Sequence, residues 1–565
     1  MEVVDYKKRS KVTRKLEKAD IVLKDANVVN VFTEEIYEAD IAIVDGIIVG
    51  VGEYEGIQEY DAKGKYVCPG FIDSHLHLES TLVTPGELIW EAARHGTTTF
   101  IVDPHESANV SGLEGIDYIL DETVDVPANV YVMMPSCVPS TEFDDNGCNI
   151  NADIMRPYLD NKRILGLGEV MDYLSVVNGD ANMHEKLNLF QNKVLDGHAP
   201  FLSDESLAAY ALAGISTDHE CVDFEYAMKE RRNGMTVLIR EGSAAKNLEA
   251  IVSGIVKSSV NTNGFCFCTD DKHIEEIKLM GHINYSVKKA VSLGIPPIKA
   301  IKMATIQAAR CYGLSNIGAI APGYQADLVV LNDLKEFQIQ EVFYKGSKID
   351  KKVEVKIKPC SEKIKNTVNV HDFSREQLKL KITKDLFPVI QMIDGQIITK
   401  MIKEEIPGSE YFEANSTFNK IAAIERHTAS GKVGVGVVKG FSITNGAIAS
   451  SVSHDSHNII VIGDNDKDME LAVKELIRTQ GGYTLVQEGR ILNTLELPIM
   501  GLMSDAGHEI VKKKLEFMIR KAHEMGVSKN MDPFITLSFM ALPVIPEIRI
   551  TPRGIFDVVE NCIIK

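Results

Sequence analysis

The chain has 565 residues and a formal net charge of −19, with 45% hydrophobic and 25% charged residues. This length exceeds that of one ordinary domain, and the composition is typical of a soluble globular protein. An acidic chain without a long Lys/Arg run is a poor candidate for binding nucleic acid.

The first 20 residues are charged and contain no apolar core of a signal peptide. No run of 18 apolar residues occurs, so we expect no membrane partner. The nine cysteines are scattered and odd in number, without a dense framework. They predict reduced thiols and a cytoplasmic location.

The N-terminal region predicts a charged arm followed by β-structure. Residues 1–18 form the arm, as a helix or an exposed strap, and residues 20–70 alternate short Ile/Val runs with turn signals such as K-D-A-N. Residues 318–348 return to the same short β-runs. We therefore expect one small β-domain, begun by residues 1–66 and completed by residues 318–360.

Residues 67–317 alternate short apolar runs with amphipathic stretches, which predicts a (β/α)8 barrel. The eight expected strands lie in V-C-P-G-F-I-D-S-H, T-T-T-F-I-V-D-P-H-E, A-N-V-Y-V-M-M-P-S, R-I-L-G-L-G-E-V, K-V-L-D-G-H-A-P, G-I-S-T-D-H-E, M-T-V-L-I-R-E-G-S and G-F-C-F-C-T-D-D. A doubly wound open sheet is the alternative, but no G-x-G-x-x-G follows the first strand.

Residues 361–565 predict a third domain of α/β or α+β type. Strands are expected in residues 433–443 and 458–463, and helices in residues 466–481 and 506–526. This region also contains an unusual polar cluster, S-H-D-S-H-N, at residues 453–458.

Ionisable side chains stand at the ends of predicted strands 1, 4, 5, 6 and 8. They are His75, His77, Glu169, His198, His219 and Asp270. In such a barrel the carboxyl ends of the strands meet at one mouth. Burying these groups is costly unless they are paired or bind a metal, although any one histidine alone would more often be structural. Nitrogen and oxygen donors suit Mn²⁺, Fe²⁺ or Zn²⁺, and six ligands predict a two-metal centre with Glu169 as the bridge.

The motifs P-G-F-I-D-S-H-L-H-L-E-S, G-H-A-P, D-H-E and C-T-D-D resemble the amidohydrolase superfamily. The further motifs V-D-P-H-E, G-L-G-E-V-M-D, R-E-G-S-A and S-H-D-S-H-N resemble the bacterial and archaeal adenine deaminases more closely. This resemblance implies hydrolytic deamination of adenine to hypoxanthine and ammonia, in purine salvage, by a metal-bridged hydroxide that attacks C6. It implies Mn²⁺ or Fe²⁺ before Zn²⁺, Asp270 as proton shuttle, and Glu169 in place of the carboxylated lysine of many relatives.

A second set of polar residues is expected to contact the substrate or to support the metal ligands. It comprises His105 and Glu106 after strand 2, Arg240 and Glu241 after strand 7, Asp271, and the C-terminal His454, Asp455 and His457. Both strand-end pairs are expected to face the mouth, and Asp271 is expected on the opposite strand face from Asp270. Surface ion pairs and a solvated loop are the alternatives.

Other functions remain open at this stage. Another binuclear amidohydrolase, such as a cyclic amidase or an N-acetyl sugar deacetylase, would use similar metals, and a non-catalytic metal-binding barrel is a third reading. H-L-E at residues 77–79 matches half of the zinc nucleobase deaminase signature, but no P-C-x-x-C exists, which excludes that class. Adenine is the expected partner, and a homodimer is plausible.

Overall fold

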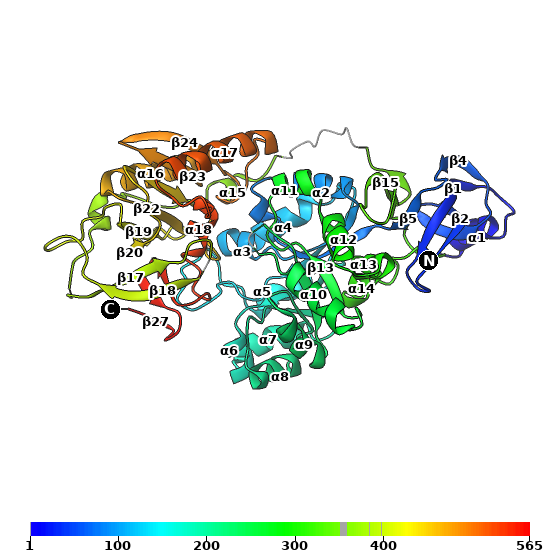
Figure 1. Cartoon of the computed structure of the whole chain (residues 1–565), viewed down its shortest axis with the longest axis horizontal. Coiled ribbons are helices and arrows are strands. Elements are labelled where there is room, and N and C mark those ends of the chain that lie inside the picture. Colours follow the sequence, from blue (N-terminus) through cyan, green and yellow to red (C-terminus); the bar gives the residue numbers. More distant parts are fainter. Residues whose placement is uncertain (1, 244, 351–358, 384, 397, 565) are drawn as a thin grey trace.

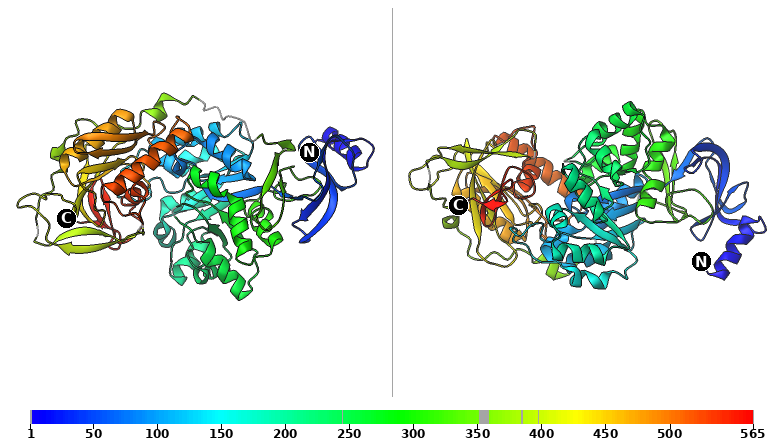
Figure 2. Two further views of the ribbon diagram at one scale, coloured as in Figure 1. Left: turned by 45° about the horizontal axis from the view of Figure 1, so that its top comes forward. Right: turned by 90° about the horizontal axis from the view of Figure 1, so that it is seen from below.

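The computed structural model describes residues 2–243, 245–350, 359–383, 385–396 and 398–564. Figure 1 shows three bodies along the long axis: a small β-domain that carries the N-terminus, a central barrel, and a C-terminal domain. The two views of Figure 2 agree that the first and last bodies lie at opposite ends of the barrel. Among the described residues, no helix combines the length and apolar character that crossing a bilayer requires.

The small β-domain is one sheet built from both flanks of the barrel. Its order is β16-β15-β14-β5-β1-β2-β3, with β4 paired to β1. The strands are β1 (Ala19–Asn30), β2 (Glu35–Val44), β3 (Ile47–Gly52), β4 (Gly56–Asp61), β5 (Tyr66–Pro69), β14 (Leu328–Leu331), β15 (Ile339–Tyr344) and β16 (Ser347–Lys348). The antiparallel pair of β5 and β14 joins the two flanks. The expected N-terminal arm is helix α1 (Val3–Thr13), which is mostly exposed.

The barrel contains the eight expected parallel strands. They are β6 (Phe71–Leu76), β7 (Thr97–Val102), β8 (Asn129–Met134), β9 (Ile164–Val170), β10 (Val194–Gly197), β11 (Thr217–Asp218), β12 (Thr236–Arg240) and β13 (Phe265–Cys268). Two arcs, β6 to β10 and β11 to β13, are joined at both ends. The Ser216 amide donates to Leu195 O at 3.0 Å, and the Asp270 amide donates to His75 O at 3.0 Å. The second bond places His75 and Asp270 side by side at the mouth.

Helices surround the barrel and connect its strands. They are η1 (Glu79–Thr81), α2 (Pro85–Arg94), α3 (His105–Ser111), α4 (Leu113–Glu122), α5 (Ala152–Met155), η2 (Arg156–Tyr158), α6 (Tyr173–Asn178), α7 (Ala181–Leu189), α8 (Asp204–Leu212), α9 (Phe224–Arg232), α10 (Leu248–Ser258), α11 (Ile274–Met280), α12 (Ile283–Ser292), α13 (Pro297–Met303) and α14 (Ile306–Cys311). Among them, α2, α8 and α9 lie in the amphipathic stretches that alternate with the predicted strands.

The C-terminal domain is an eight-stranded sheet with helices and a separate three-stranded sheet, so the predicted fold class is confirmed. Its larger sheet has the order β18-β17-β20-β19-β22-β21-β23-β24. The elements are α15 (Glu362–Lys365), η3 (Arg375–Leu378), β17 (Phe387–Met392), β18 (Thr399–Glu404), β19 (Phe418–Ile424), β20 (Val433–Lys439), β21 (Gly446–Ser450), β22 (Ile459–Gly463), α16 (Asp466–Thr479), β23 (Gly482–Gln487), β24 (Arg490–Glu496), α17 (His508–Glu524), α18 (Pro533–Phe539), β25 (Ile548–Thr551), β26 (Gly554–Asp557) and β27 (Cys562–Ile563).

Asp145, in the loop between β8 and α5, fastens the C-terminal domain to the barrel. Its carboxylate accepts a hydrogen bond from Lys432 Nζ at 2.7 Å and two from Arg553, through Nε and Nη2, each at 3.0 Å. Its main-chain oxygen accepts the Asn458 amide at 2.6 Å. A bidentate Arg–carboxylate pair is among the more specific polar contacts. The Asn458 bond attaches the S-H-D-S-H-N loop to the barrel, since Asn458 is the last residue of that loop.

Candidate metal centre

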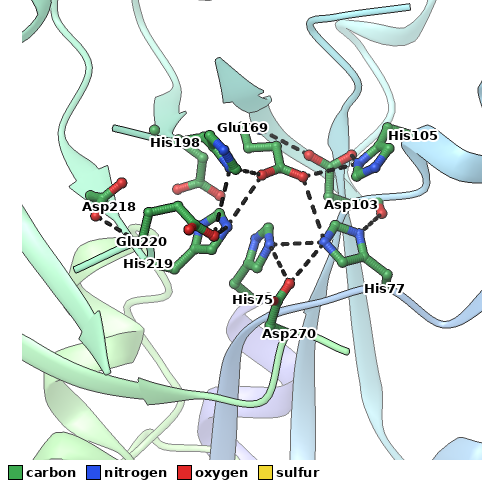
Figure 3. Close-up of polar contacts among 12 residues, drawn as sticks. His75, His77, Asp103, His105, Glu169, His198, Asp218, His219, Glu220 and Asp270 are labelled. Atoms are coloured by element: carbon green, nitrogen blue, oxygen red, sulfur yellow. Dashed lines mark hydrogen bonds and ion pairs between the residues drawn. The ribbon is translucent and has the colours of Figure 1, made fainter. Parts of the chain in front are cut away.

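Glu169, the next-to-last residue of β9, lies at the middle of a group of histidines (Figure 3). Its Oε1 is 3.0 Å from His105 Nδ1 and 3.5 Å from His77 Nε2. Its Oε2 is 2.9 Å from His198 Nδ1 and 3.2 Å from His219 Nε2. Each carboxylate oxygen therefore faces a different pair of rings, an arrangement that suits one carboxylate shared by two cations.

The second carboxylate, Asp270, faces the histidines of the first strand. His75 Nε2 and His77 Nε2 are 3.2 Å apart. Asp270 Oδ1 lies 3.1 Å from the His77 nitrogen and 3.7 Å from the His75 nitrogen. Figure 3 shows these three side chains converging below Glu169. The structure thus brings together all six side chains that the sequence singled out as ligands.

The donor set fits a divalent cation on two observations. Several triplets have ligand atoms within 4.8 Å of one another, among them His75–His77–Glu169, His75–His219–Asp270 and Glu169–His198–His219. In addition, His77 Nδ1 lies 2.8 Å from the main-chain oxygen of Asp103, which can only accept. His77 therefore donates through Nδ1, which leaves Nε2 as the ring nitrogen that can bind a cation at the centre.

Both carboxylates are held in the charged form that a metal ligand requires. Burial alone would raise the pKa of Glu169, but contacts with His105, His198 and His219 outweigh it and keep that pKa well below its usual range. Burial likewise opposes ionisation of Asp270, but the Arg240 guanidinium keeps its pKa well below the ordinary value. Arg240 Nη1 is 2.8 Å from Asp270 Oδ2.

Asp103, which directly follows strand β7, was not predicted from the sequence. Its Oδ2 accepts the Glu169 amide at 2.9 Å, and its main-chain oxygen orients His77. Gly168 permits this approach, because a Cβ there would lie 2.2 Å from Asp103 Oδ2. Two features of the sequence could have indicated this contact. One is the aspartate in V-D-P-H-E, directly after a predicted strand, and the other is the glycine that precedes Glu169 in G-L-G-E.

Asp218 and Glu220, which flank His219, were also missed. Asp218 accepts the amides of Ala199 at 2.6 Å and Glu220 at 2.8 Å, which fixes the loop that carries His219. Glu220 Oε1 is 3.5 Å from His219 Nε2 and pairs with Arg240. The acidic residues on both sides of the histidine in T-D-H-E were the sign available in the sequence.

Arg240, the last residue of β12, and Glu241, the residue after it, lie in two different environments. Arg240 faces the centre, where it contacts Asp270 and Glu220, as expected. Glu241 does not, because its carboxylate accepts Lys289 Nζ from helix α12 at 2.8 Å. The expectation that both side chains face the mouth is therefore wrong for Glu241. Neighbouring residues of an extended chain point to opposite faces, and the prediction that both residues face the mouth did not take this alternation into account.

The remaining candidates meet around Glu106, which is buried at the start of α3. Ser80 Oγ lies 2.7 Å from Glu106 Oε1 and also contacts Asp271 Oδ1. Asp271 therefore turns toward Glu106 rather than lying on an opposite strand face, because it follows the end of β13. From the C-terminal domain, His457 Nε2 is 3.5 Å from Glu106 Oε2 and His454 Nδ1 is 3.8 Å from Glu106 Oε1.

The S-H-D-S-H-N loop thus reaches the barrel. Asp455 Oδ1 lies 3.8 Å from His105 Nε2. The main-chain amide of Ser453 donates to His457 Nδ1 at 3.1 Å. The neutral His457 ring therefore carries its proton on Nε2, facing Glu106, and this tautomer offers a hydrogen bond rather than a metal ligand.

A pocket opens beside this cluster, between the barrel and the C-terminal domain. The barrel contributes Ser80 and Asp271 to its wall, and the C-terminal domain contributes His454, Tyr483, Ser538 and Phe539. The rings of His454 and Phe539 stack with centroids 4.8 Å apart and planes 26° apart.

Comparison with known proteins matches two families along the chain. Residues 66–349 match the amidohydrolase family, and residues 396–562 match the adenine deaminase C-terminal domain. The adenine deaminase of Desulfitobacterium hafniense is 55% identical over 99% of both chains. That of Clostridium acetobutylicum is 46% identical over 96% of this chain and 97% of its own length. Adenine deaminase 2 of Carboxydothermus hydrogenoformans is 43% identical over 96% of this chain and 95% of its own length.

Proposed function

Because the chain belongs to the adenine deaminase family of the amidohydrolases, we propose that it hydrolyses adenine to hypoxanthine and ammonia. The observation that carries this proposal is the convergence of four histidines and two carboxylates on one barrel mouth, in a chain that matches adenine deaminases from end to end. Imidazole and carboxylate groups gathered in this way typically bind divalent metal ions, so we expect the activity to depend on metal.

In this proposal, His75, His77, Glu169, His198, His219 and Asp270 hold two divalent cations, with Glu169 shared between them. One of its oxygens faces His77 and the other faces His198 and His219, which supports that role. Mn²⁺ or Fe²⁺ is proposed before Zn²⁺ because of the resemblance to adenine deaminases; nitrogen and oxygen donors without thiolate suit all three ions. When bound, the cations would lower the pKa of a water so that it can attack at neutral pH.

Asp270 is the proposed proton shuttle. Its carboxylate is charged and lies where the ligands of the first strand converge, so it can accept a proton from the attacking water. Passing that proton to the exocyclic nitrogen lets the amine leave as ammonia. Arg240 keeps the carboxylate charged and oriented through its 2.8 Å contact. His105 and Asp103 support Glu169 and His77 from behind.

The test is ammonia release by protein loaded with Mn²⁺, measured with adenine, dihydroorotate and N-acetylglucosamine 6-phosphate as rival substrates. Deamination of adenine alone supports the proposal. Hydrolysis of either amide instead would favour a cyclic amidase or a deacetylase. Bound metal without turnover of any of the three would favour a non-catalytic barrel.

The proposed setting is purine salvage in the cytoplasm, with the enzyme as a homodimer. All nine cysteines lie among the described residues and are free thiols, which supports a reducing compartment. Light scattering of the purified protein tests the dimer.

A further inference from the structure

The S-H-D-S-H-N loop contains a backbone conformation that needs support from its surroundings. His457 is buried and has a φ of 52°, in the left-handed region that residues other than glycine rarely adopt. A residue keeps such a conformation only where surrounding contacts hold it. Within the loop, the His457 amide donates to Ser453 O at 2.7 Å, and the Ser453 amide donates back to His457 Nδ1. The other contacts that hold the loop come from outside it.

Two consecutive residues just beyond strand β19, Arg426 and His427, bind three consecutive residues of the loop. The Arg426 amide donates to Asn458 Oδ1 at 3.2 Å, and Arg426 Nε donates to the main-chain oxygen of His457. His427 Nε2 lies 2.7 Å from the main-chain oxygen of Ser456. A main-chain oxygen can only accept, so His427 is the donor in this bond.

Arg426 is fixed on its other side by residues far from the loop. Its side chain is fully buried. Its Nη2 donates to Met500 O at 2.9 Å, and its Nη1 donates to Thr367 Oγ1 at 3.1 Å. Gly501 permits this approach, because a Cβ there would lie 2.7 Å from Nη1. The planar guanidinium therefore joins the loop to two further segments of the C-terminal domain in fixed directions.

The segment that carries His427 is also held in place. The Glu425 carboxylate accepts the Thr428 amide at 2.7 Å, and the amide and hydroxyl of Ser430 at 2.9 and 2.7 Å. Burial and the neighbouring Arg426 lower the pKa of His427 to about 3. The ring is therefore neutral at neutral pH, and its single proton lies on Nε2, where it bonds to the loop.

The opposite side of the loop contacts the barrel mouth. Asp455 Oδ1 lies 3.8 Å from His105 Nε2, and His457 Nε2 lies 3.5 Å from Glu106 Oε2. His105 Nδ1 in turn lies 3.0 Å from Oε1 of Glu169. A displacement of the loop is therefore transmitted to the proposed bridging carboxylate through one imidazole ring.

We propose that His427, on the framework that Arg426 fixes, is a positioning residue of the reaction: it holds the S-H-D-S-H-N loop in the conformation that contacts the barrel mouth. This inference rests on the proposed function and adds to it a residue that lies behind the loop, outside the metal centre. His427 acts through the main-chain oxygen of a residue 29 positions away in the chain.

The variants that test this role are H427M and H427Q, made in the full-length chain. Gln and Met have similar lengths, but only Gln keeps an N–H group that can donate to the Ser456 oxygen. His523 is the matched control: it is partly buried in the same domain and donates to Val527 O at 3.2 Å, but it lies on helix α17.

Hydrogen–deuterium exchange of peptides that span residues 453–458 measures the hold on the loop without any turnover. We expect faster exchange in H427M than in the wild type, H427Q and H523M. With saturating Mn²⁺, H427M should deaminate adenine with a kcat about 3- to 10-fold lower at a similar KM, the scale of one hydrogen bond. H427Q should recover most of that loss, and H523M should keep the wild-type kcat.

Metal content and melting temperature separate positioning from stability. A role in stability alone would lower the melting temperature of H427M but leave its kcat per bound metal unchanged, and that result would overturn the inference. Unchanged loop exchange in H427M, or an H427Q variant as impaired as H427M, would overturn it as well. If the wild type releases no ammonia from adenine, the proposed function fails, while the exchange comparison still decides whether His427 holds the loop.

Discussion

His77 donates a hydrogen bond from Nδ1 to the main-chain oxygen of Asp103 at 2.8 Å. The bond fixes the ring so that Nε2 points at Glu169 and Asp270. An imidazole held in this way by an acceptor behind it is the usual arrangement of a metal-binding histidine.

We predict that His77→Ala lowers the content of divalent metal and reduces kcat/KM for adenine by at least about 100-fold, because a ligand and its orienting bond are both lost. Elemental analysis and steady-state kinetics measure the two effects. His371→Ala is the control, since His371 is exposed and outside the cluster. Unchanged metal content in His77→Ala would remove His77 from the ligand set.

Replacing Asp103 should weaken metal binding although Asp103 is not a proposed ligand. Asp103→Ala loses the acceptor for the Glu169 amide, and we expect metal affinity to fall about 10- to 100-fold. Competition with a coloured chelator measures the affinity, and Asp160→Ala, at an exposed position, is the control. Equal affinities in both variants would show that Glu169 needs no support from Asp103.

The barrel and its six candidate ligands were predictable because the signal is local. Each strand is a short apolar run, and each ligand stands at the end of its strand, so residue order alone placed His75 and Asp270 at one mouth. The side chains behind the ligands were harder to find. Asp103 acts partly through its main-chain oxygen, which no residue type reveals. Arg240 and Glu241 are adjacent polar residues at a strand end, and the sequence pattern did not show that only Arg240 faces the centre.

The position of the C-terminal domain over the mouth could not be derived from residue patterns. It depends on pairs such as Asp145 and Arg553, which are 408 residues apart in the chain. The periodicity of apolar residues predicts helices and strands, but it does not predict contacts between residues this far apart in the chain.

The Asp145 attachment should make stability depend on pH in a defined direction. Burial alone would raise the pKa of Asp145, but hydrogen bonds from Arg553 and Lys432 outweigh it and keep the pKa below its ordinary value of 3.8. A lowered pKa in the folded state means that the stabilisation is fully present above about pH 4 and is lost as the pH falls through the lowered value.

Asp145→Asn should therefore melt at a lower temperature than the wild type at pH 7, and the difference should shrink as the pH falls from 4 to 3. Thermal scans of both proteins across this range measure it. Asp160→Asn, at an exposed position, should match the wild type throughout. A difference that stays constant down to pH 3 would show that the Asp145 charge does not contribute.

Removing the metal should destabilise the barrel as well as stop turnover, because a ligand that binds only the folded state stabilises it by mass action. We expect chelation to lower the melting temperature and added Mn²⁺ to restore both the melting temperature and the activity. A chain with His75 and His219 both changed to Ala should show no response to chelator. The same melting temperature with and without chelator in the wild type would contradict a metal site in the barrel.

The most direct test of the central claim is ammonia release from adenine by the protein loaded with Mn²⁺, with Asp270→Asn measured beside it. We predict one ammonia and one hypoxanthine per adenine for the wild type. For the variant we predict a kcat lower by about 100-fold or more, the scale of general acid–base catalysis. No ammonia from the metal-loaded wild type would contradict the assignment as an adenine deaminase, and full activity in Asp270→Asn would contradict the role of Asp270.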